Sequence, residues 1–561
     1  MEKIKKRSSG WRKFGKVLLW IAGVFLVLIL ALVFYVVRAG RMDPPEIADK
    51  SSMEWQRKQI STTAYTLGNN WFRKSKSGLY EMYIEGKPFE RGVTYGKLAE
   101  ELVVRQEEAF TSQLKKMVPS QSYLKFLKYF IGFFNRHLLE SVIPEYQQEI
   151  YGVSLSASHD YDFIGTNFQR IMNYHAAHDI GHALQSMALV GCTSFGTWNG
   201  RSADSNLIIG RNFDFYVGDK FAEDKIIAFY KPEQGYKFMM VTWGGFTGVV
   251  SGMNDQGLTV TINAAKTDMP SGSATPVSLV AREILQYAKN IQEAYAIAKK
   301  RRMFVAESFL VGSAADNRAA LIEKTPDTIA LYDPKGDEIT CANHFQSTEL
   351  SHLSSNETQM KESASPYRYK RLAQLLQRNG PNTVQKTINI LRDQKGIDEA
   401  NIGMGNEKAV NQLIAHHAIV FEPKQLKVWV SAAPWQLGEF VAYDLNKIFA
   451  MNGLESDHEV CDSANIIPAD TFLLTDDYKR FVDFRKLKQD VIDGKEVDVK
   501  RMIADNPQYY HAYVLAGDYW YKRKEFKTAL PYYQQALTKV IATMPEENYV
   551  RERIKLINGK P

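Results

Sequence analysis

The chain has 561 residues, of which 45% are hydrophobic and 12% aromatic, so it is long enough for one large packed domain with appendages. Its 70 basic and 63 acidic residues leave a formal net charge of +7, and the densest basic cluster lies at the N-terminus. We therefore expect no nucleic-acid partner. Three cysteines without a CxxC pair do not indicate a disulfide scaffold, and their odd number leaves at least one thiol free.

The N-terminal part predicts a membrane anchor. Residues 17–37 are an uncharged apolar run long enough to cross a bilayer as a helix. The basic tail at residues 1–16 should stay in the cytoplasm, so the chain after about residue 40 should be periplasmic or extracellular. A cleaved signal peptide, with Val37-x-Ala39 as a poor cleavage site, is the alternative, and it would also export the remainder.

The middle of the chain changes from helical to strand-rich. After a polar linker at residues 38–78, residues 79–191 are expected to form a strand and then mostly helices. Residues 192–450 alternate between strand groups and helix groups, with hairpins such as the one around residues 255–257. This pattern favours an α+β fold with two antiparallel sheets between helical layers, a four-layer αββα plan.

Residues 470–561 have the pattern of a small helical, tetratricopeptide-like region. Small and aromatic residues occupy the positions typical of one such helix pair, namely Tyr513, Gly517, Ala529, Tyr533 and Ala536. One pair cannot bury its apolar face alone, so it should pack on neighbouring helices. The region is either a C-terminal cap or a module that binds a protein partner through residues 507–557.

A cysteine stands behind a glycine at the start of a predicted strand. If the Gly191–Cys192 bond is cut, Cys192 gains an α-amino group with a pKa of about 8 beside its own thiol, so one residue supplies both nucleophile and base. Such a pair needs a cation that favours the thiolate and an acceptor that orients the amine. Arg211 and Asp214 suit these roles, because a tight hairpin at residues 199–206 returns them to the side of Cys192.

Four segments in a fixed order carry a family resemblance. The segments "GCTSF", "GRNFDF", "GLTVTINAA" and "CANHF" resemble the cysteine branch of the N-terminal nucleophile (Ntn) hydrolases. More narrowly, they resemble the peptidase C45 or acyl-coenzyme A:6-aminopenicillanic acid acyltransferase family, which is related to choloylglycine hydrolase. The resemblance covers about residues 80–445 and implies an Ntn-hydrolase fold. It implies these site residues: Cys192, Arg211, Asp214, Asn263, Asn343 and Arg368.

Two of these assignments carry further expectations. Asparagine amides at strand ends can donate hydrogen bonds to an oxyanion, which is the role expected of Asn263 and Asn343. Arg368 matches the second arginine of the family, and Arg371 lies close enough to be its alternative.

The resemblance implies an amidohydrolase or acyltransferase without cofactor or metal. The precursor would cut itself before Cys192, and the mature enzyme would cleave linear N-acyl amides and pass the acyl group to water or an amine. Residues 123–139 carry large apolar side chains together with Lys125, Lys128 and Arg136. This segment either covers the sheet or forms part of an acyl-binding pocket.

Histidines offer rival constellations. One helical face could hold a metal through His175, His178 and His182. The second alternative is a papain-like dyad of Cys192 with a histidine, which would be His344, His416 or His417. That dyad requires the cysteine on a helix, whereas "CTSFGTW" has strand composition. In a non-enzymatic interpretation, the chain is a membrane-tethered scaffold with an inert hydrolase fold, and its C-terminal helices bind partners.

Overall fold

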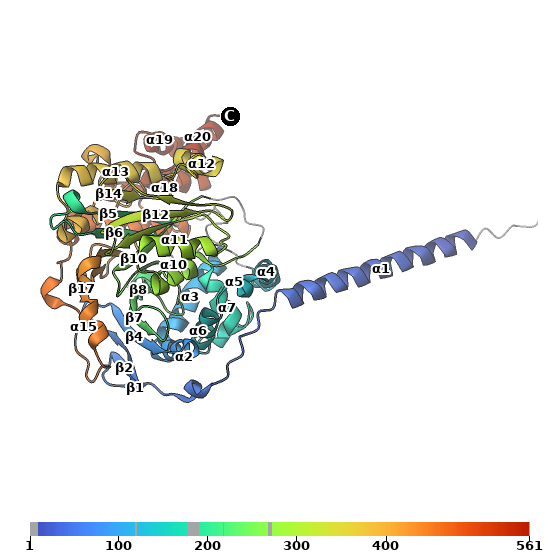
Figure 1. The fold of residues 1–561 in the computed structure, drawn as a ribbon. Coiled ribbons are helices and arrows are strands. Elements are labelled where there is room, and N and C mark those ends of the chain that lie inside the picture. The colour runs from blue at the N-terminus through green and yellow to red at the C-terminus, as the bar shows by residue number, and fades with distance from the viewer. Residues whose placement is uncertain are drawn as a thin grey trace, which may run out of the picture.

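The computed structural model describes residues 9–117, 120–176, 179, 190–216, 218–266 and 272–559. Two stacked β-sheets form the centre of the body, and helices cover their outer faces (Figure 1). A helical lobe sits at the C-terminal end, and the long N-terminal helix projects from the body.

The larger sheet has 11 strands in the order β1-β2-β3-β4-β7-β8-β9-β10-β11-β12-β13. Neighbouring strands are antiparallel, except that β4 and β7 run parallel. This one pair departs from the expected antiparallel pattern, because the chain between them passes through several helices and two strands of the other sheet. The strands are β1 (Lys58–Gln59), β2 (Ala64–Leu67), β3 (Asn70–Lys74), β4 (Tyr80–Gly86), β7 (Ile226–Pro232), β8 (Phe238–Thr242), β9 (Ser251–Asn254), β10 (Leu258–Ala264), β11 (Glu307–Ser313), β12 (Arg318–Lys324) and β13 (Ile329–Tyr332).

The smaller sheet has six strands, all antiparallel, in the order β14-β5-β6-β15-β16-β17. They are β5 (Val190–Thr197), β6 (Ile208–Phe215), β14 (Glu338–Cys341), β15 (His417–Glu422), β16 (Lys427–Ser431) and β17 (Phe440–Asp444).

The α-helices surround the sheets or lie at the two ends of the chain. Before the catalytic cysteine candidate they are α1 (Ser9–Ala39), α2 (Pro88–Leu98), α3 (Glu100–Met117), α4 (Gln121–Phe134), α5 (Leu138–Ser141), α6 (Pro144–Ser154) and α7 (Asn167–His175). After it they are α9 (Asp219–Glu223), α10 (Val277–Tyr287), α11 (Ile291–Lys300), α12 (Ser354–Glu362), α13 (Ser365–Asn379), α14 (Val384–Leu391), α15 (Leu445–Ala450), α16 (Asp476–Ile492), α17 (Val499–Asp505), α18 (Tyr510–Lys522), α19 (Phe526–Ala536) and α20 (Met544–Asn558).

Three apolar cores confirm the four-layer αββα plan. Between the sheets, side chains such as Phe229 of β7 and Ile419 of β15 pack in one cluster. Helices α2, α6 and α10 pack on the outer face of the larger sheet. On the outer face of the smaller sheet, Leu372 of α13 and Ile388 of α14 pack against Val420 of β15. Each sheet is therefore buried on both faces, which explains its nearly continuous apolar strands.

The structure corrects the expected linker at residues 38–78. Strands β1, β2 and β3 fall within it and extend the larger sheet, with Trp71 and Phe72 buried. Arg73 of β3 is also buried and pairs with Glu81 of β4, at 2.5 Å between Nη1 and Oε2. A strand whose charged side chain is buried in an ion pair reads as polar in sequence, which is why this segment resembled a linker.

The C-terminal region is helical, as expected. Helices α16 to α20 enclose their own apolar core, with Ala529, Tyr533 and Ala536 fully buried. Gly517 of α18 allows the close approach of α19, because a Cβ atom there would lie 2.7 Å from the Tyr533 ring. The lobe also contacts the body, where Arg485 of α16 pairs with Asp219 of α9.

Among the described residues, one helix is long and apolar enough to cross a membrane. It covers Lys13–Ala39, has a mean hydropathy of 3.1 and is not buried against the body. A signal sequence near the N-terminus would have the same character, so the apolar helix is confirmed while its anchoring role stays a prediction.

Candidate active site

Strands β5 and β6 bring the first predicted residues together. In their antiparallel register Cys192 lies opposite Phe213, and Ser194 lies opposite Arg211. Residues opposite each other share a face of the sheet, so Arg211 and Cys192 point to the same side. The Arg211 Nη2 atom lies 3.6 Å from Cys192 Sγ. The structure therefore confirms that the hairpin returns Arg211 to the side of Cys192.

Arg211 is fully buried and has further acceptors in the larger sheet. It donates to Ser251 Oγ at 2.5 Å and to the carbonyl oxygen of Ile262. Burial raises the pKa of the Cys192 thiol above its ordinary value, and the charge of Arg211 opposes that shift. This guanidinium is thus the group that favours the thiolate in a buried site.

Two asparagines hold strand β10 and the segment after β14 together at the cysteine. Asn263 donates from Nδ2 to the carbonyl of Ala342 at 3.1 Å, and Asn343 donates from Nδ2 to the carbonyl of Ala264 at 3.0 Å. The side-chain oxygen of Asn263 accepts a hydrogen bond from Ser194 Oγ at 2.8 Å. The asparagine amides thus brace both segments against β5.

Asn343 has a contact that the sequence did not predict. Its Oδ1 accepts from the backbone nitrogen of Cys192 at 3.0 Å and also from Arg368 Nη2. Asn343 is therefore the acceptor that faces the nitrogen which cleavage would free, a role the sequence analysis gave to Asp214. This corrects the assignment for the uncut chain.

Arg368 and Arg371 separate clearly in the structure. Arg368 reaches Asn343 and donates from Nη1 to the carbonyl of Glu407 at 2.9 Å. Arg371, one helical turn away on α13, is fully buried against Asp393 and Glu399, both at 2.8 Å. Arg368 is thus the second arginine of the site, and Arg371 belongs to an ion-pair network elsewhere.

Asp214 lies opposite Gly191, on the other face of the strand pair from Arg211. Its Oδ2 accepts from Gln412 Nε2 at 3.3 Å, and its Oδ1 is buried without a hydrogen-bond partner among the described residues. Burial raises the pKa of Asp214 to about 7, although Arg368 and Arg211 act in the opposite direction. The carboxyl group can therefore hold or release a proton near neutral pH.

Gly191 packs closely against the side chain of Gln412, so a larger residue at this position would displace Gln412. A Cβ atom at this position would lie 2.5 Å from Gln412 Nε2 and 3.2 Å from its Oε1. Because Gln412 comes from an irregular segment before β15, strand patterns could not reveal it. Ser194 was also missed, but its position two residues after Cys192 on the same strand face is a signal that could have found it.

The histidines do not form the rival constellations in the described part of the chain. His175 donates from Nδ1 to the carbonyl of Ile171 and accepts at Nε2 from Thr247, so neither ring nitrogen is open to a metal. His178 and His182 lie outside the described residues. Within the described ranges no group of three metal-binding side chains occurs.

The candidate dyad histidines bond elsewhere. His344 Nδ1 lies 2.7 Å from Ser365 Oγ, and burial lowers the pKa of this histidine to about 4. His416 and His417 face each other through Nδ1 atoms 2.9 Å apart. With Cys192 on a strand and these partners in place, the papain-like arrangement is wrong for this fold.

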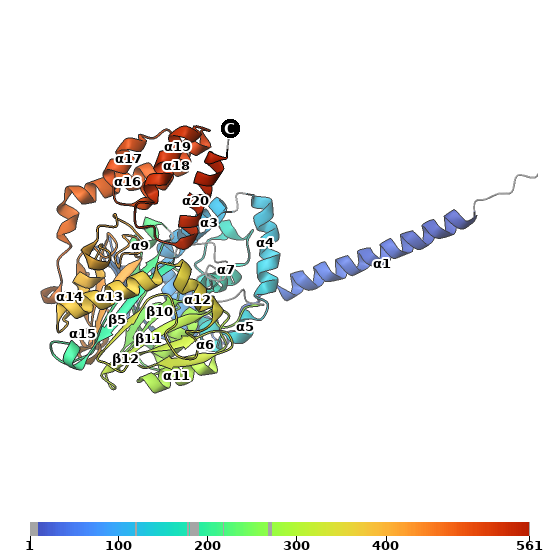
Figure 2. The same cartoon turned by 90° about the horizontal axis from the view of Figure 1, so that it is seen from above.

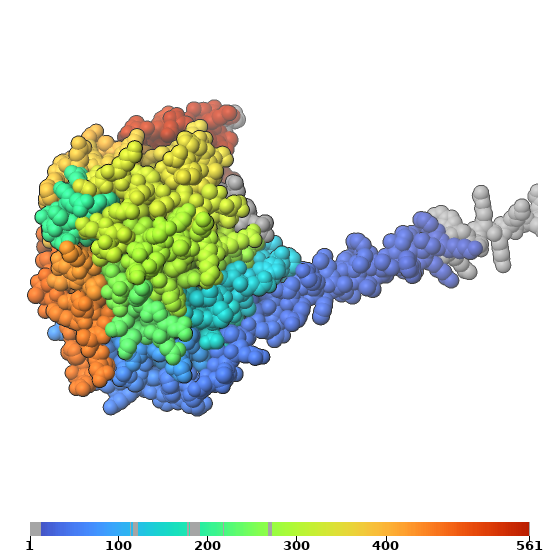
Figure 3. Space-filling model, in the orientation of Figure 1, coloured from blue at the N-terminus to red at the C-terminus, as the bar shows by residue number. Residues whose placement is uncertain are grey.

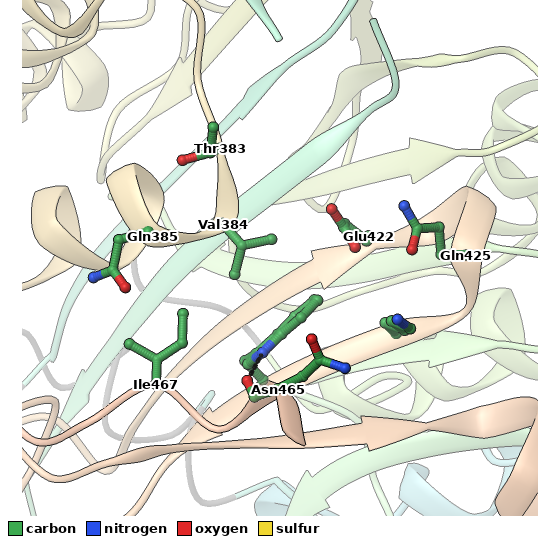
Figure 4. A pocket seen from close by; sticks show the side chains of 9 residues that line it. Thr383, Val384, Gln385, Glu422, Gln425, Asn465 and Ile467 are labelled. Atoms are coloured by element: carbon green, nitrogen blue, oxygen red, sulfur yellow. Dashed lines mark hydrogen bonds between the residues drawn. The ribbon is translucent and has the colours of Figure 1, made fainter. Parts of the chain in front are cut away.

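The site is closed in the uncut chain. The side chains of Cys192, Arg211, Asp214 and Asn263 are all fully buried. In contrast, Tyr123, Phe126, Tyr129 and Phe130 of α4 are exposed at the surface. A surface pocket exists beside α14 and the β15–β16 hairpin (Figure 4), and it shares no residue with the site. Its lining residues are Thr383, Val384, Gln385, Glu422, Gln425, Lys427, Trp429, Asn465 and Ile467.

Part of the chain matches a known protein family. Residues 198–434 match the family model of acyl-coenzyme A:6-aminopenicillanic acid acyl-transferase. This confirms the predicted family resemblance over that range, which begins after Cys192 and so does not include the candidate nucleophile.

Curated relatives are distant and matched in part. An uncharacterized protein of Archaeoglobus fulgidus is 24% identical over 310 residues, which are 49% of this chain and 51% of that protein. Protein dcd1B of Dictyostelium discoideum is 20% identical over 271 residues, which are 45% of this chain and 51% of that protein. The chain thus spans about half the length of the curated relatives it matches.

Solved structures give distant matches. A Caenorhabditis elegans N-acylethanolamine-hydrolyzing acid amidase ortholog is 16% identical, with 42% of this chain and 93% of that chain covered and a TM-score of 0.31. A mutant of conjugated bile acid hydrolase from Clostridium perfringens is 12% identical, with 46% of this chain and 93% of that chain covered and a TM-score of 0.32.

Proposed function

We propose that this chain is a cysteine Ntn hydrolase or acyltransferase that cuts itself before Cys192 and acts on the C–N bond of linear N-acyl amides. The observation that carries the proposal is the double contact of Cys192. Its sulfur faces the buried cation of Arg211, and its backbone nitrogen donates to Asn343. A residue held at both atoms is prepared to use its thiol as nucleophile and its nitrogen as base.

The first step is self-cleavage. The sulfur of Cys192 adds to the carbonyl carbon of Gly191, and the C–N bond to Cys192 breaks. The nitrogen keeps its own hydrogen and takes up the proton that the thiol released, which makes it a free amine. Water then hydrolyses the resulting thioester, which frees the Gly191 carboxylate and restores the thiol. The position of Asn343 Oδ1 supports this step, because in the uncut chain it accepts from the nitrogen that the cut would turn into an amine.

Turnover repeats the chemistry on a substrate. The α-amine of Cys192 takes the proton of the thiol, and the sulfur attacks the acyl carbonyl of the amide. The protonated amine then passes its proton to the departing nitrogen, and water or a second amine releases the acyl group. Asn263 uses one amide hydrogen for the carbonyl of Ala342, and its second amide hydrogen is the one proposed to stabilise the oxyanion.

The family name supports an acyl group as the transferred part, because the matching model is that of an acyl-transferase. A panel of N-acyl amides assayed for amine release, with Cys192→Ala as control, tests this. We expect turnover that depends on Cys192 and exceeds the rate on unmodified peptides. Equal cleavage of plain peptides would contradict the acyl preference, and the absence of any Cys192-dependent turnover would favour the inert scaffold.

We also propose that α1 anchors the enzyme in a membrane with its N-terminus in the cytoplasm and the catalytic body outside. The exposed apolar surface of α1 and the basic residues before it support this topology. A reporter that is active only after export, fused after Pro45, should show activity. A reporter signal restricted to the cytoplasm would overturn the orientation.

The C-terminal helices are proposed to form a tetratricopeptide-like unit with room for a protein partner. The packing of Gly517 on Tyr533 supports the helix-pair geometry. Pull-down with the full chain and with a Tyr513→Ala variant, which alters a half-buried residue of the lobe, tests whether this surface binds a protein.

A further inference from the structure

Helix α4 exposes an unusual number of aromatic side chains. Tyr123, Phe126, Tyr129 and Phe130 are 52%, 63%, 42% and 63% exposed. Outside α1, no other stretch of eight described residues exposes four large hydrophobic side chains. Residues 123, 126 and 130 follow a spacing of three and four, so they form one stripe along the helix, while Leu124 faces inward and is buried. A stripe of this kind marks an interaction surface.

Helix α4, which carries this stripe, is in contact with α1. Helix α4 packs against the C-terminal end of α1, where the rings of Tyr35 and Phe133 meet edge to face with centroids 6.1 Å apart. The backbones touch at two glycines: a Cβ atom on Gly132 would lie 2.7 Å from the carbonyl oxygen of Gly40. Gln169 of α7 donates to that same carbonyl at 3.0 Å. The base of α1 is therefore fixed to the body through α4.

This contact lies at the level where the apolar part of α1 ends. The uncharged run stops at residue 37, and the exposed charges of Arg38 and Arg41 follow within one turn of Gly40. If α1 spans a bilayer, these arginines mark the membrane surface. Helix α4 then lies at that surface, because Gly132 touches Gly40.

The orientation of α4 is also consistent with a position at the membrane surface. Its axis runs across the axis of α1 (Figure 2), and the surface that includes α4 borders the base of the projecting helix (Figure 3). A helix that lies across a membrane-spanning helix at its exit runs along the membrane plane. Aromatic side chains are the residues that favour the headgroup region, and Lys125, also exposed, can reach lipid phosphates.

We propose that α4 is a membrane-docking helix that lies in the bilayer interface and holds the catalytic body against the lipid surface. The occupant of its exposed stripe is the lipid bilayer. The inference rests on the proposed anchoring through α1 and extends the proposed function, since an enzyme held in this way meets amphiphilic acyl amides in the membrane. The stripe is not part of the Cys192 site, so it can be changed without changing the chemistry.

Photo-crosslinking tests the occupant directly. The full chain, with p-benzoylphenylalanine in place of Phe126 or Phe130, is reconstituted into phosphatidylcholine and phosphatidylglycerol vesicles that carry a clickable phospholipid. Leu474, 82% exposed in the C-terminal region, is the matched control position. We expect lipid adducts from positions 126 and 130 and none from 474. Crosslinks to a second copy of the chain or to another protein, or the same lipid labelling at all three positions, would overturn the proposal.

Activity gives a second, independent readout. The double variant Phe126→Glu with Phe130→Glu should cleave an N-acyl amide embedded in vesicles at least ~10-fold more slowly, because interfacial binding weakens with lost apolar contact and added negative charge. A short, water-soluble N-acyl amide should be cleaved at the wild-type rate, and Leu474→Glu should change neither rate. Equal losses on both substrates would mean that the stripe supports the fold instead. If the chain has no activity at all, the proposed function fails, while the crosslinks still decide the role of α4.

Discussion

Replacing Asp214 by asparagine should stabilise the folded chain at neutral and alkaline pH. The carboxyl group of Asp214 is fully buried, and one of its oxygens has no hydrogen-bond partner among the described residues. Burial therefore raises its pKa from the ordinary value of 3.8 to about 7, against the opposing charges of Arg368 and Arg211. Asparagine keeps the shape and the acceptor for Gln412 but never ionises.

The sign follows from proton binding. Below pH 4 the carboxyl group is protonated in both the folded and the unfolded chain, and it adds no pH dependence. Between about pH 4 and 7 the unfolded chain releases this proton while the folded chain keeps it, so the free energy of unfolding falls as pH rises. At about 1.4 kcal/mol for each pH unit of separation between the two pKa values, the loss reaches ~4 kcal/mol at pH 8.

The assay is urea unfolding at pH 4 and pH 8, in a Cys192→Ala background so that self-cleavage does not intervene. The difference in unfolding free energy between the Asp214→Asn chain and its parent should increase by ~4 kcal/mol from pH 4 to pH 8. Asp457→Asn is the control, because hydrogen bonds from Ser61, Arg73 and Thr63 outweigh partial burial and lower the pKa of Asp457. It should show no gain at pH 8. A difference that stays flat for Asp214→Asn would refute the reasoning.

Three further predictions concern the cysteine and its neighbours. Cys192→Ala should abolish both self-cleavage and turnover, whereas in the wild type N-terminal sequencing of the smaller band should begin Cys-Thr-Ser-Phe; an intact, active chain would contradict this. Arg211→Met should shift the pH at which kcat/KM rises upward by about 1–3 pH units. The control Arg371→Met, which removes another fully buried arginine, should lower the melting temperature but leave that pH unchanged. Gly191→Ala should slow self-cleavage by displacing Gln412, as measured by intact mass over time, and Gln412→Ala in the same chain should restore part of the rate.

How far the site could be predicted differs from residue to residue. Arg211 could be expected from strand pairing as well as from the resemblance, because the next strand along the chain pairs with the strand of Cys192. Asn343 and Arg368 lie far along the chain, and only the family resemblance pointed to them. Gln412 could not be predicted, since an irregular segment has no periodicity that places its side chains.

Polar residues also hid part of the fold. The polar composition around Arg73 predicts a linker where strand β3 lies, yet Arg73 is buried beside Glu81. Residues 123–139 show the converse case, because their apolar side chains are compatible with a covering helix or with a pocket. In α4, Tyr123, Phe126, Tyr129 and Phe130 are exposed while Leu124 is buried. The sequence shows how apolar a segment is, but it does not show whether that segment packs against the body or stays at the surface. Tertiary contacts decide this.

The C-terminal lobe is part of the support of the active site. The segment before β15 supplies the carbonyl of Glu407 to Arg368 and the amide of Gln412 to Asp214. The lobe holds that segment by hydrogen bonds: Asn506 both accepts from Met404 N at 3.0 Å and donates to its carbonyl at 2.8 Å. The Tyr509 hydroxyl donates to the Glu407 carboxylate at 3.2 Å. Since the segment has no strand or helix of its own to fix it, these bonds supply the rigidity that a preorganised site requires. The lobe therefore has a structural reason to be present even before any partner binds to it.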